Sequence, residues 1–338
     1  MTERPDETPT PRQATSREHP WLRIDVGNLG PLIALIVMFV IYTSLTPNFF
    51  TVSNITNVMV QSAALTILAA GQTFPVLSAG LDLSQGSIVS LVSVVTAGTI
   101  LHFGLVPGLI AGVATGIAVG LVSGLLVGLA RIQPFIVTLG MLYVGSGAAM
   151  VFTNGSVVFG LPEPAVSRFF WLGGGFIGPL PVPVMIAAVV VAGIYFVLNY
   201  TRFGRHVYAV GGNAEVAHMS GVPVALVKVG IYVISGGLAG LGGILLSARV
   251  ISGQPLLGSG DLLLLSIGAV IIGGTSIFGG EGGVLRTVLG VLVIAFMVNG
   301  LNLLAISTFM QSIIVGAIII ASVWANTIRS RRKVGGSP

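Results

Sequence analysis

Long, uninterrupted runs of apolar residues dominate this chain and limit it to a membrane fold. A spanning helix needs about 20 apolar residues, and ten runs approach or exceed that length, with limits close to 30–46, 55–79, 86–104, 106–130, 135–153, 183–200, 225–251, 262–277, 284–304 and 306–325. With 54% hydrophobic and 7% charged residues among 338, the chain has too little charge to cover a soluble globule. We expect an all-α, polytopic membrane protein with about ten transmembrane helices, some of them broken by glycine-rich segments.

The basic residues predict how these runs are oriented. All Lys and Arg except Arg168 and Arg249 fall on one side if the two termini, the turns at Arg131 and Arg286 and the loop 201–224 share that side. By the positive-inside rule, that side is the cytoplasm. We therefore expect both termini to be cytoplasmic.

Composition divides the chain into one membrane domain and two tails. Residues 1–28 carry four prolines and mixed charge and are expected to be a disordered cytoplasmic tail. The membrane domain covers 29–326, with a polar cytoplasmic loop at 201–224 and a Gly- and Pro-rich loop at 154–182 on the opposite, periplasmic side. Residues 327–338 form a basic cytoplasmic tail. The chain has no cysteine, so disulfides and thiolate metal sites are excluded.

The polar loop 201–224 contains the start and stop signals of a short helix. Asn213 is a good N-cap, Glu215 suits the first turn, and Gly221 supplies a C-terminal stop, which together predict a helix over 214–220. One face carries the small residues Ala214, Ala217 and Gly221, and another carries Val216, Met219 and Ser220. This shape suits docking into a groove of a partner; the alternative is an ordinary solvated loop.

Two glycine-rich segments interrupt the apolar runs. The first, SAGLDLSQG, covers Ser78 to Gly86 and includes Gly80, Asp82, Ser84 and Gln85; Asp82 and Gln85 have the spacing of a capping box that starts the next helix. Asp82 could instead bind a cation or a proton. The second segment, Val270 to Gly283, contains Gly273 and Gly274 and resembles the first loosely. Paired broken segments in two halves of a transporter point to the translocation path.

A glycine ridge runs along the predicted helix 106–130. Glycine recurs every four residues at 108, 112, 116, 120, 124 and 128, which permits another helix backbone to approach closely. A spacing of four exceeds the helical repeat of about 3.6 residues, so the ridge winds around its helix and its neighbours must cross it obliquely. Gly236, Gly240 and Gly243 mark a second close-packing helix.

Polar side chains within the apolar runs are candidates for a translocation path. Asn54, Asn57 and Gln61 share one helical face, Asn299 and Asn302 form a smaller one, and Gln72 stands apart. In lipid such faces must look inward. Hydrogen bonding between helices and contact with a solute explain them equally well at this stage.

Several kinds of chemistry have no signature in the sequence. There is no GxxxxGK[ST] loop for ATP, no HExxH or similar metal spacing among four dispersed histidines, and no GxSxG elbow. Few intramembrane charges favour a neutral polar solute over ions or protons. We expect no enzymatic activity in this chain and no cofactor or metal bound by it.

Five segments in register resemble the permease subunit of ribose-, xylose- and galactose-type (monosaccharide) ABC importers. They are FPVLSAGLDLSQGSIVSL, Ile132 to Tyr143, TRFGRHVYAVGGNAEVAHMSGV, AVIIGGTSIFGGEGG and NGLNLL, and they span roughly Pro47 to Ala325. The segment around Thr201 also contains the TxxGR pattern of that family, with Arg202, Gly204 and Arg205.

The resemblance implies a bacterial inner-membrane permease that forms the path for a monosaccharide or a similar small polar solute. It implies a second permease copy or a related permease, cytoplasmic P-loop ATPase subunits that use ATP and Mg, and a periplasmic or lipid-anchored binding protein. It also implies that the short helix is the coupling helix, with Arg202, Gly204, Arg205, Gly212, Asn213, Ala214, Glu215, Ala217, Ser220 and Gly221 taking part in ATPase coupling.

Two departures from the family pattern leave the solute open. Ala79 and Gln85 replace a glycine and a valine of the first broken segment, and Leu263 to Ala269 lacks both acids usual before GGTS, with Asp261 the nearest acid. The fold prediction does not depend on these positions. A branched-chain amino-acid permease of the same superfamily, or a secondary transporter without an ATPase, are the alternatives.

Overall fold

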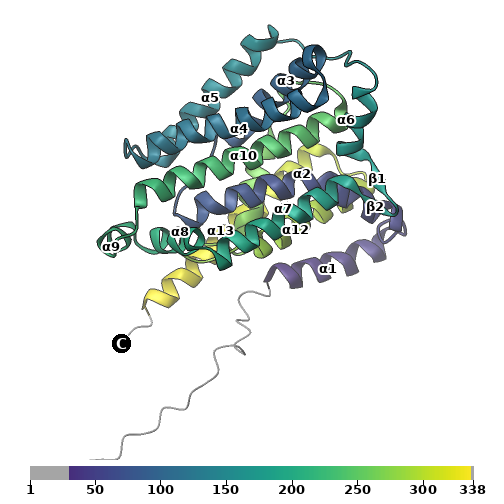
Figure 1. The fold of residues 1–338 in the computed structure, drawn as a ribbon. Coiled ribbons are helices and arrows are strands. Elements are labelled where there is room, and N and C mark those ends of the chain that lie inside the picture. Colours follow the sequence, from purple (N-terminus) through teal and green to yellow (C-terminus); the bar gives the residue numbers. More distant parts are fainter. Residues whose placement is uncertain (1–29, 336–338) are drawn as a thin grey trace, which may run out of the picture.

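The computed structural model describes residues 30–335, which form an almost entirely helical domain (Figure 1). The elements are α1 Gly30–Leu45, α2 Val52–Leu77, α3 Gln85–Phe103, α4 Leu105–Gly128, α5 Pro134–Thr153, α6 Ala165–Gly174, β1 Phe176–Ile177, β2 Leu180–Pro181, α7 Val182–Tyr200, α8 Arg202–Gly212, α9 Ala214–Met219, α10 Val224–Val250, α11 Asp261–Ile272, α12 Val284–Leu303 and α13 Thr308–Gly335. The predicted tail 1–28 lies outside the described residues, as do 336–338.

The helices agree closely with the apolar runs. Within the described residues, seven helices are long and apolar enough to cross a membrane, and three shorter apolar helices account for the remaining runs. Two limits differ. The run 262–277 contains a helix that ends at Ile272, and the last helix continues past the run to Gly335, through the stretch predicted as a basic tail.

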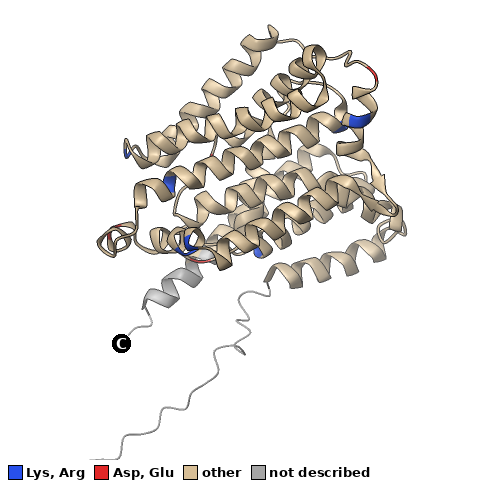
Figure 2. Cartoon of the chain, in the orientation of Figure 1, with Lys and Arg blue, Asp and Glu red and all other residues tan. Residues whose placement is uncertain are grey.

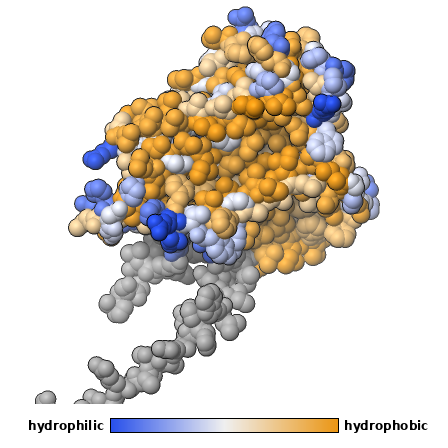
Figure 3. All heavy atoms as spheres, viewed as in Figure 1, coloured by the Kyte–Doolittle hydropathy of each residue, from blue (hydrophilic) through white to orange (hydrophobic). Residues whose placement is uncertain are grey.

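The long helices lie roughly side by side as rods, with α2 and α10 near the middle of the bundle (Figure 1). Of the elements outside the bundle, α8 and α9 lie at one end, called here the α9 end, and α6 with the β1–β2 hairpin at the other, the α6 end. Charged residues lie near these two ends in Figure 2, and Figure 3 shows apolar surface between them. This distribution is that of a protein surrounded by lipid.

The predicted glycine ridge forms the most extensive helix contact in the described bundle. A Cβ atom on Gly116 or Gly120 of α4 would overlap a backbone carbonyl oxygen of α10, and one on Gly236 would overlap the carbonyl of Gly116. Further along the ridge, Gly108 faces Ile100 of α3 instead. The ridge therefore winds from α10 to α3, and the close packing expected at Gly236 is confirmed.

The predicted loop at the α6 end is more ordered than its composition indicated. Helix α6 begins at Ala165, and Phe169 is completely buried, whereas its neighbours Phe170 and Trp171 are partly exposed. Gly173 packs against the backbone of Arg249 at the end of α10. Phe169 and Gly173 thus both anchor the loop to the bundle.

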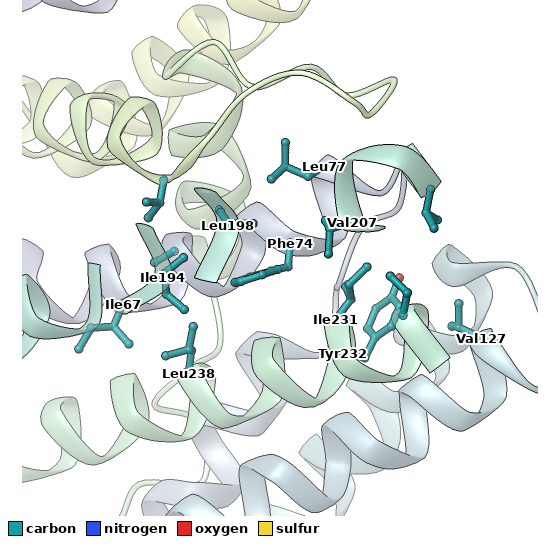
Figure 4. Close-up of a cluster of buried hydrophobic side chains, with 14 of the residues drawn as sticks. Ile67, Phe74, Leu77, Val127, Ile194, Leu198, Val207, Ile231, Tyr232 and Leu238 are labelled. Carbon is teal, nitrogen blue, oxygen red and sulfur yellow. The ribbon is translucent and has the colours of Figure 1, made fainter. Parts of the chain in front are cut away.

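A buried apolar cluster connects the bundle to α8 (Figure 4). Val207 of α8 lies among Phe74 of α2, Leu198 of α7 and Ile231 of α10, all of which belong to one cluster. Burial of a side chain of this size stabilises the folded state by about 1.5–3 kcal/mol. Helix α8 is therefore fixed to the membrane domain on its apolar face.

Candidate functional site

Helix α8 begins with a cap that also explains the TxxGR pattern. The Thr201 hydroxyl accepts a hydrogen bond from the Gly204 amide at 3.2 Å and donates to the Val197 carbonyl at 2.6 Å. A Cβ atom on Gly204 would overlap the carbonyl of Leu198, so only glycine permits α8 to fold back onto α7. Arg202 and Arg205 then point away from the bundle and are exposed.

Helix α9 has the cap and stop that the sequence predicts. The Asn213 side chain accepts from the amides of Glu215 and Val216, both at 3.0 Å, and Gly221 follows the helix with φ of +82°. Ala217 is buried against the domain, whereas Met219 is 82% exposed. Val216 is exposed next to Met219, so the helix presents two apolar side chains outside the bundle.

The end of α8 touches the end of α2 and the second glycine-rich segment through backbone contacts. A Cβ atom on Gly211 would overlap the carbonyl oxygen of Leu77, the last residue of α2. The same carbonyl accepts a hydrogen bond from the Gly280 amide at 2.9 Å, and Gly279 packs against Gly211. We call this contact of Leu77, Gly211, Gly279 and Gly280 the glycine junction. It leaves no flexible side chains between the three segments.

A tyrosine of α8 adds a second connection to the same glycine-rich segment. The Tyr208 hydroxyl donates to the carbonyl of Gly282 at 3.0 Å. Burial raises the pKa of the Tyr208 hydroxyl above its ordinary value, although the charge of Arg286 opposes the shift. The hydroxyl therefore stays protonated and remains a donor across the physiological pH range.

A cavity of about 450 Å³ lies beside the corner between α8 and α9. Its lining combines residues 211–214 of that corner with Ser78 and Ala79, Lys228 and Tyr232 of α10, and Phe278. The cavity lies between the corner and part of α10, whereas Val210 and Ala217 on either side of the corner pack in the same buried apolar cluster as Ile231 of α10.

The segment 78–84, called here the first break, is held by a buried polar network. The Asp82 carboxylate accepts from the Ser84 amide at 3.0 Å, from the Ser84 hydroxyl, and from the Ser235 hydroxyl of α10 at 2.6 Å. Ser235 also accepts from the Gln85 side chain at 3.0 Å. All four side chains are buried. The network joins α3 to α10 and surrounds the acid with donors.

Only half of the predicted capping box is present. Asp82 accepts from an amide at the start of α3, as expected. Gln85 does not return to the Asp82 amide; its side chain donates to Ser235 and to the Leu68 carbonyl. Gln72 of α2 makes this contact instead. When its side-chain amide is oriented to satisfy the N–H and the carbonyl of Asp82, its oxygen accepts from the Asp82 amide at 3.1 Å. A neighbouring helix thus completes the cap.

A second irregular segment enters the membrane domain, and the sequence did not predict it. Residues 252–260, the re-entrant segment, run along α3: the Gln254 amide donates to the Ser93 hydroxyl at 2.9 Å, and the Gly258 amide donates to Ser90 at 3.0 Å. Gly258 packs directly on Gly86, near the start of α3. Serine hydroxyls thus replace water as partners for non-helical backbone.

Comparison with known proteins agrees with this architecture. Residues 54–323 match the family described as branched-chain amino acid transport system / permease component. The chain belongs to this permease family.

Several named relatives align with most of the permease. It is 40% identical over 294 residues to the ribose import permease protein RbsC of Escherichia coli K12, covering 86% of this chain and 91% of that protein. It is 39% identical to the Bacillus subtilis (strain 168) protein of the same name, and the alignment covers 87% of this chain and 91% of that protein. It is 37% identical to the D-allose transport system permease protein AlsC of Escherichia coli K12, with 89% of this chain and 92% of that protein covered. No solved structure gives a significant match.

In the structure, the six polar residues predicted for the path of the permease fall into two groups: those with a hydrogen-bond partner on another segment and those that are exposed. Asn54 and Asn299 form a reciprocal amide pair between α2 and α12, at 2.8 and 2.9 Å. Asn302 accepts from Gln311 of α13 at 2.7 Å. Gln72 belongs to the network around Asp82. These contacts are interhelical, whereas Asn57 and Gln61 are exposed on α2.

The predicted break residues lie at or beside helix ends. Gly80 packs against the Tyr232 hydroxyl, and Gly86 is the contact point of the re-entrant segment. Gly273 follows the last residue of α11 and packs on the backbone of Arg286, and Gly274 has φ of +89°. Gly273 thus lets α11 turn tightly onto α12.

Helix α8 and the re-entrant segment were not predicted from the sequence. For α8, the signals were a capping threonine at 201 and the apolar pair Val207 and Val210, which the structure buries. For the re-entrant segment, the signal was Gly253 and Gly258 next to a short apolar run, together with the serines at 90 and 93 of another helix.

Proposed function

We propose that this chain is the membrane-spanning subunit of an ATP-driven importer for a monosaccharide. The observation that carries the proposal is the α8–α9 unit, residues 202–219, because it combines an exposed docking surface with a rigid backbone connection to the membrane domain. The names of the relatives at 37–40% identity, which concern ribose and allose, support a sugar.

The α9 end is the cytoplasmic end in this proposal. Arg202 and Arg205 lie in α8 at this end. The start of α10 with Lys228, the end of α4 before Arg131 and the start of α12 with Arg286 pack near them, whereas Arg168 of α6 and Arg249 at the end of α10 lie at the α6 end. The positive-inside rule then places α9 in the cytoplasm of a bacterial inner membrane. A delivery protein would approach the α6 end from the periplasm.

The α8–α9 unit would seat in a groove of a cytoplasmic P-loop ATPase, which would hold ATP and Mg. Val216 and Met219 supply the apolar contact and are 57% and 82% exposed. Arg202, Arg205 and Glu215 are exposed around it and offer charge complementarity. Gly204, Gly212, Asn213, Ala214, Ala217, Ser220 and Gly221 shape the unit rather than contact the partner.

Movement of the unit would pass to the membrane domain through the glycine junction. When closure of the ATPase displaces α9, the end of α8 moves with it, because Asn213 alone separates the two helices. Gly211 then pushes on the carbonyl of Leu77 and on Gly279, since no side chain lies between them. The displacement therefore reaches the end of α2 and the loop before α12 together.

A branched-chain amino-acid solute is the main alternative, and the family description names it. An amino acid is a zwitterion, so its path needs a partner for each charge. The exposed polar side chains that the described part of α2 and the start of α11 offer at membrane level are the amides of Asn57 and Gln61 and the acid Asp261, and none of them would balance the carboxylate of an amino acid. Amides suit hydroxyl groups, which both donate and accept hydrogen bonds.

The proposal can be tested by purifying the tagged permease from its native membrane and identifying the proteins that accompany it. We expect a P-loop ATPase in the complex of the unaltered chain and its loss in Met219→Asp, which places a charge on the docking surface. A lone permease that transports solute in liposomes without nucleotide would instead show a secondary transporter.

A second variant separates docking from coupling. Gly211→Ala should retain the ATPase but lose at least 90% of nucleotide-driven uptake, because its Cβ atom would overlap the Leu77 carbonyl. Gly193→Ala in α7 is the matched control, since nothing lies within 4 Å of its added Cβ. Normal uptake by Gly211→Ala would remove the glycine junction from the mechanism.

A further inference from the structure

Asp261, the first residue of α11, lies deep in the membrane domain. Gln85 at the start of α3 donates to the carbonyl of Leu68, which is nine residues, or roughly 14 Å at 1.5 Å per residue, before the end of α2. Gly258 packs on Gly86, the next residue of α3. Asp261 follows three residues later, so it lies at about the level of Leu68.

The packing of α11 places Asp261 at the same depth independently. Leu262 and Leu265 of α11 pack in one apolar cluster with Leu65 and Ala69 of α2. The two helices therefore run alongside each other from these residues onward, and Asp261 lies where that contact begins. On α2, Gln61 is one helical turn before Leu65 and Asn57 is one turn further.

The carboxylate of Asp261 is free and exposed at this depth. No hydrogen bond or ion pair to it occurs among the described residues, and its neighbours Ser259 and Gly260 are exposed as well. Asn57 and Gln61 are exposed on the adjacent helix. A charged group facing hydrocarbon at this level costs several kcal/mol, so such residues face a water-filled cavity or a partner.

We propose that Asp261, together with Gln61 and Asn57, lines the solute path, where its carboxylate accepts hydrogen bonds from hydroxyl groups of a neutral, polyhydroxylated solute. This inference rests on the proposed function, because a second permease subunit must cover the face and leave water in between. A carboxylate binds vicinal hydroxyls through charge-assisted hydrogen bonds, which are roughly twice as strong as neutral ones. It also repels anionic solutes.

Cysteine labelling tests this placement without knowledge of the solute, because the chain contains no cysteine of its own. The full complex carrying Asp261→Cys or Gln61→Cys should react with a charged, water-soluble thiol reagent. Val189→Cys is the control: Val189 is 73% exposed in the middle of α7, an apolar side chain of the kind that faces lipid. We expect at least tenfold slower labelling there.

The charge of Asp261 gives a second readout that a purely structural residue would not produce. At Gln61→Cys, a cationic thiol reagent should react about tenfold faster than an anionic one of the same size, because a free carboxylate concentrates cations in a narrow water-filled space. The additional substitution Asp261→Asn should bring this ratio close to one. Glu163→Gln, which changes an exposed acid at the α6 end, should leave it unchanged.

The outcomes distinguish this inference from the proposed function. If Asp261→Cys labels as slowly as Val189→Cys, or if Asp261→Asn leaves the reagent ratio unchanged, the path does not pass Asp261. Should the same preparations still contain the ATPase, only this inference fails. If they lack the ATPase, the importer proposal fails as well.

Discussion

Two acids lie next to irregular segments of the membrane domain, and their surroundings differ completely. Asp82 in the first break is fully buried and accepts hydrogen bonds from Ser84 and Ser235. Asp261, at the end of the re-entrant segment, is exposed on the bundle and has no partner among the described residues. Surrounding donors therefore give Asp82 a structural role, whereas the carboxylate of Asp261 has no donor around it in the described fold and is free for the role proposed above.

Among the variants that test this comparison, replacement of Asp82 should cause the largest loss in the free energy of unfolding. Asp82→Ala leaves the Ser84 amide and the Ser235 hydroxyl without their acceptor in a site closed to water. A buried donor left without its acceptor costs about 1–3 kcal/mol, so we expect the two together to cost about 2–6 kcal/mol. Thermal unfolding in detergent, followed by tryptophan fluorescence, measures it; a loss below about 1 kcal/mol would show that the network is not structural.

An intermediate effect is expected where the two irregular segments meet. Gly258→Ala places a Cβ atom on the carbonyl of Gly86, and overpacking of this kind costs about 1–3 kcal/mol. Gly193→Ala serves again as control, because its added methyl group meets nothing within 4 Å. Equal unfolding temperatures of the two variants would contradict the close packing of the re-entrant segment on α3.

The smallest effect on stability is expected at Asp261. Asp261→Asn removes a charge that stabilises no contact within the described chain, so the free energy of unfolding should change by less than about 0.5 kcal/mol. The same thermal measurement checks this, with Glu163→Gln as a second exposed acid. A loss of more than about 2 kcal/mol would give Asp261 the structural role that we assign to Asp82.

The sequence predicts features that depend on local spacing. Helix limits follow from apolar runs, the α9 cap follows from Asn213 and Gly221, and a closely packed face on α4 follows from glycine at every fourth position. Each of these signals lies within one short stretch of chain. The glycine ridge specifies its own helix face, although not the helix that packs against it.

Features that depend on distant partners could not be predicted in the same way. Asp82 resembles an ordinary helix cap until Ser235, 153 positions away, is placed beside it. The re-entrant segment needs hydroxyl groups of α3, 161 and 168 positions away. Asn54 and Asn299 show the opposite case. Each was predicted separately as a path residue, and in the fold their side-chain amides hydrogen-bond to each other.

The serine contacts of the re-entrant segment also bear on how the protein is inserted during synthesis. Helix α11 has 12 residues and a length of roughly 18 Å, too short to cross a hydrocarbon core of about 30 Å unaided. The preceding residues cannot enter lipid until Ser90 and Ser93 are there to receive their amides. Because α3 leaves the ribosome before residues 252–260, translation from the N-terminus supplies these partners in time.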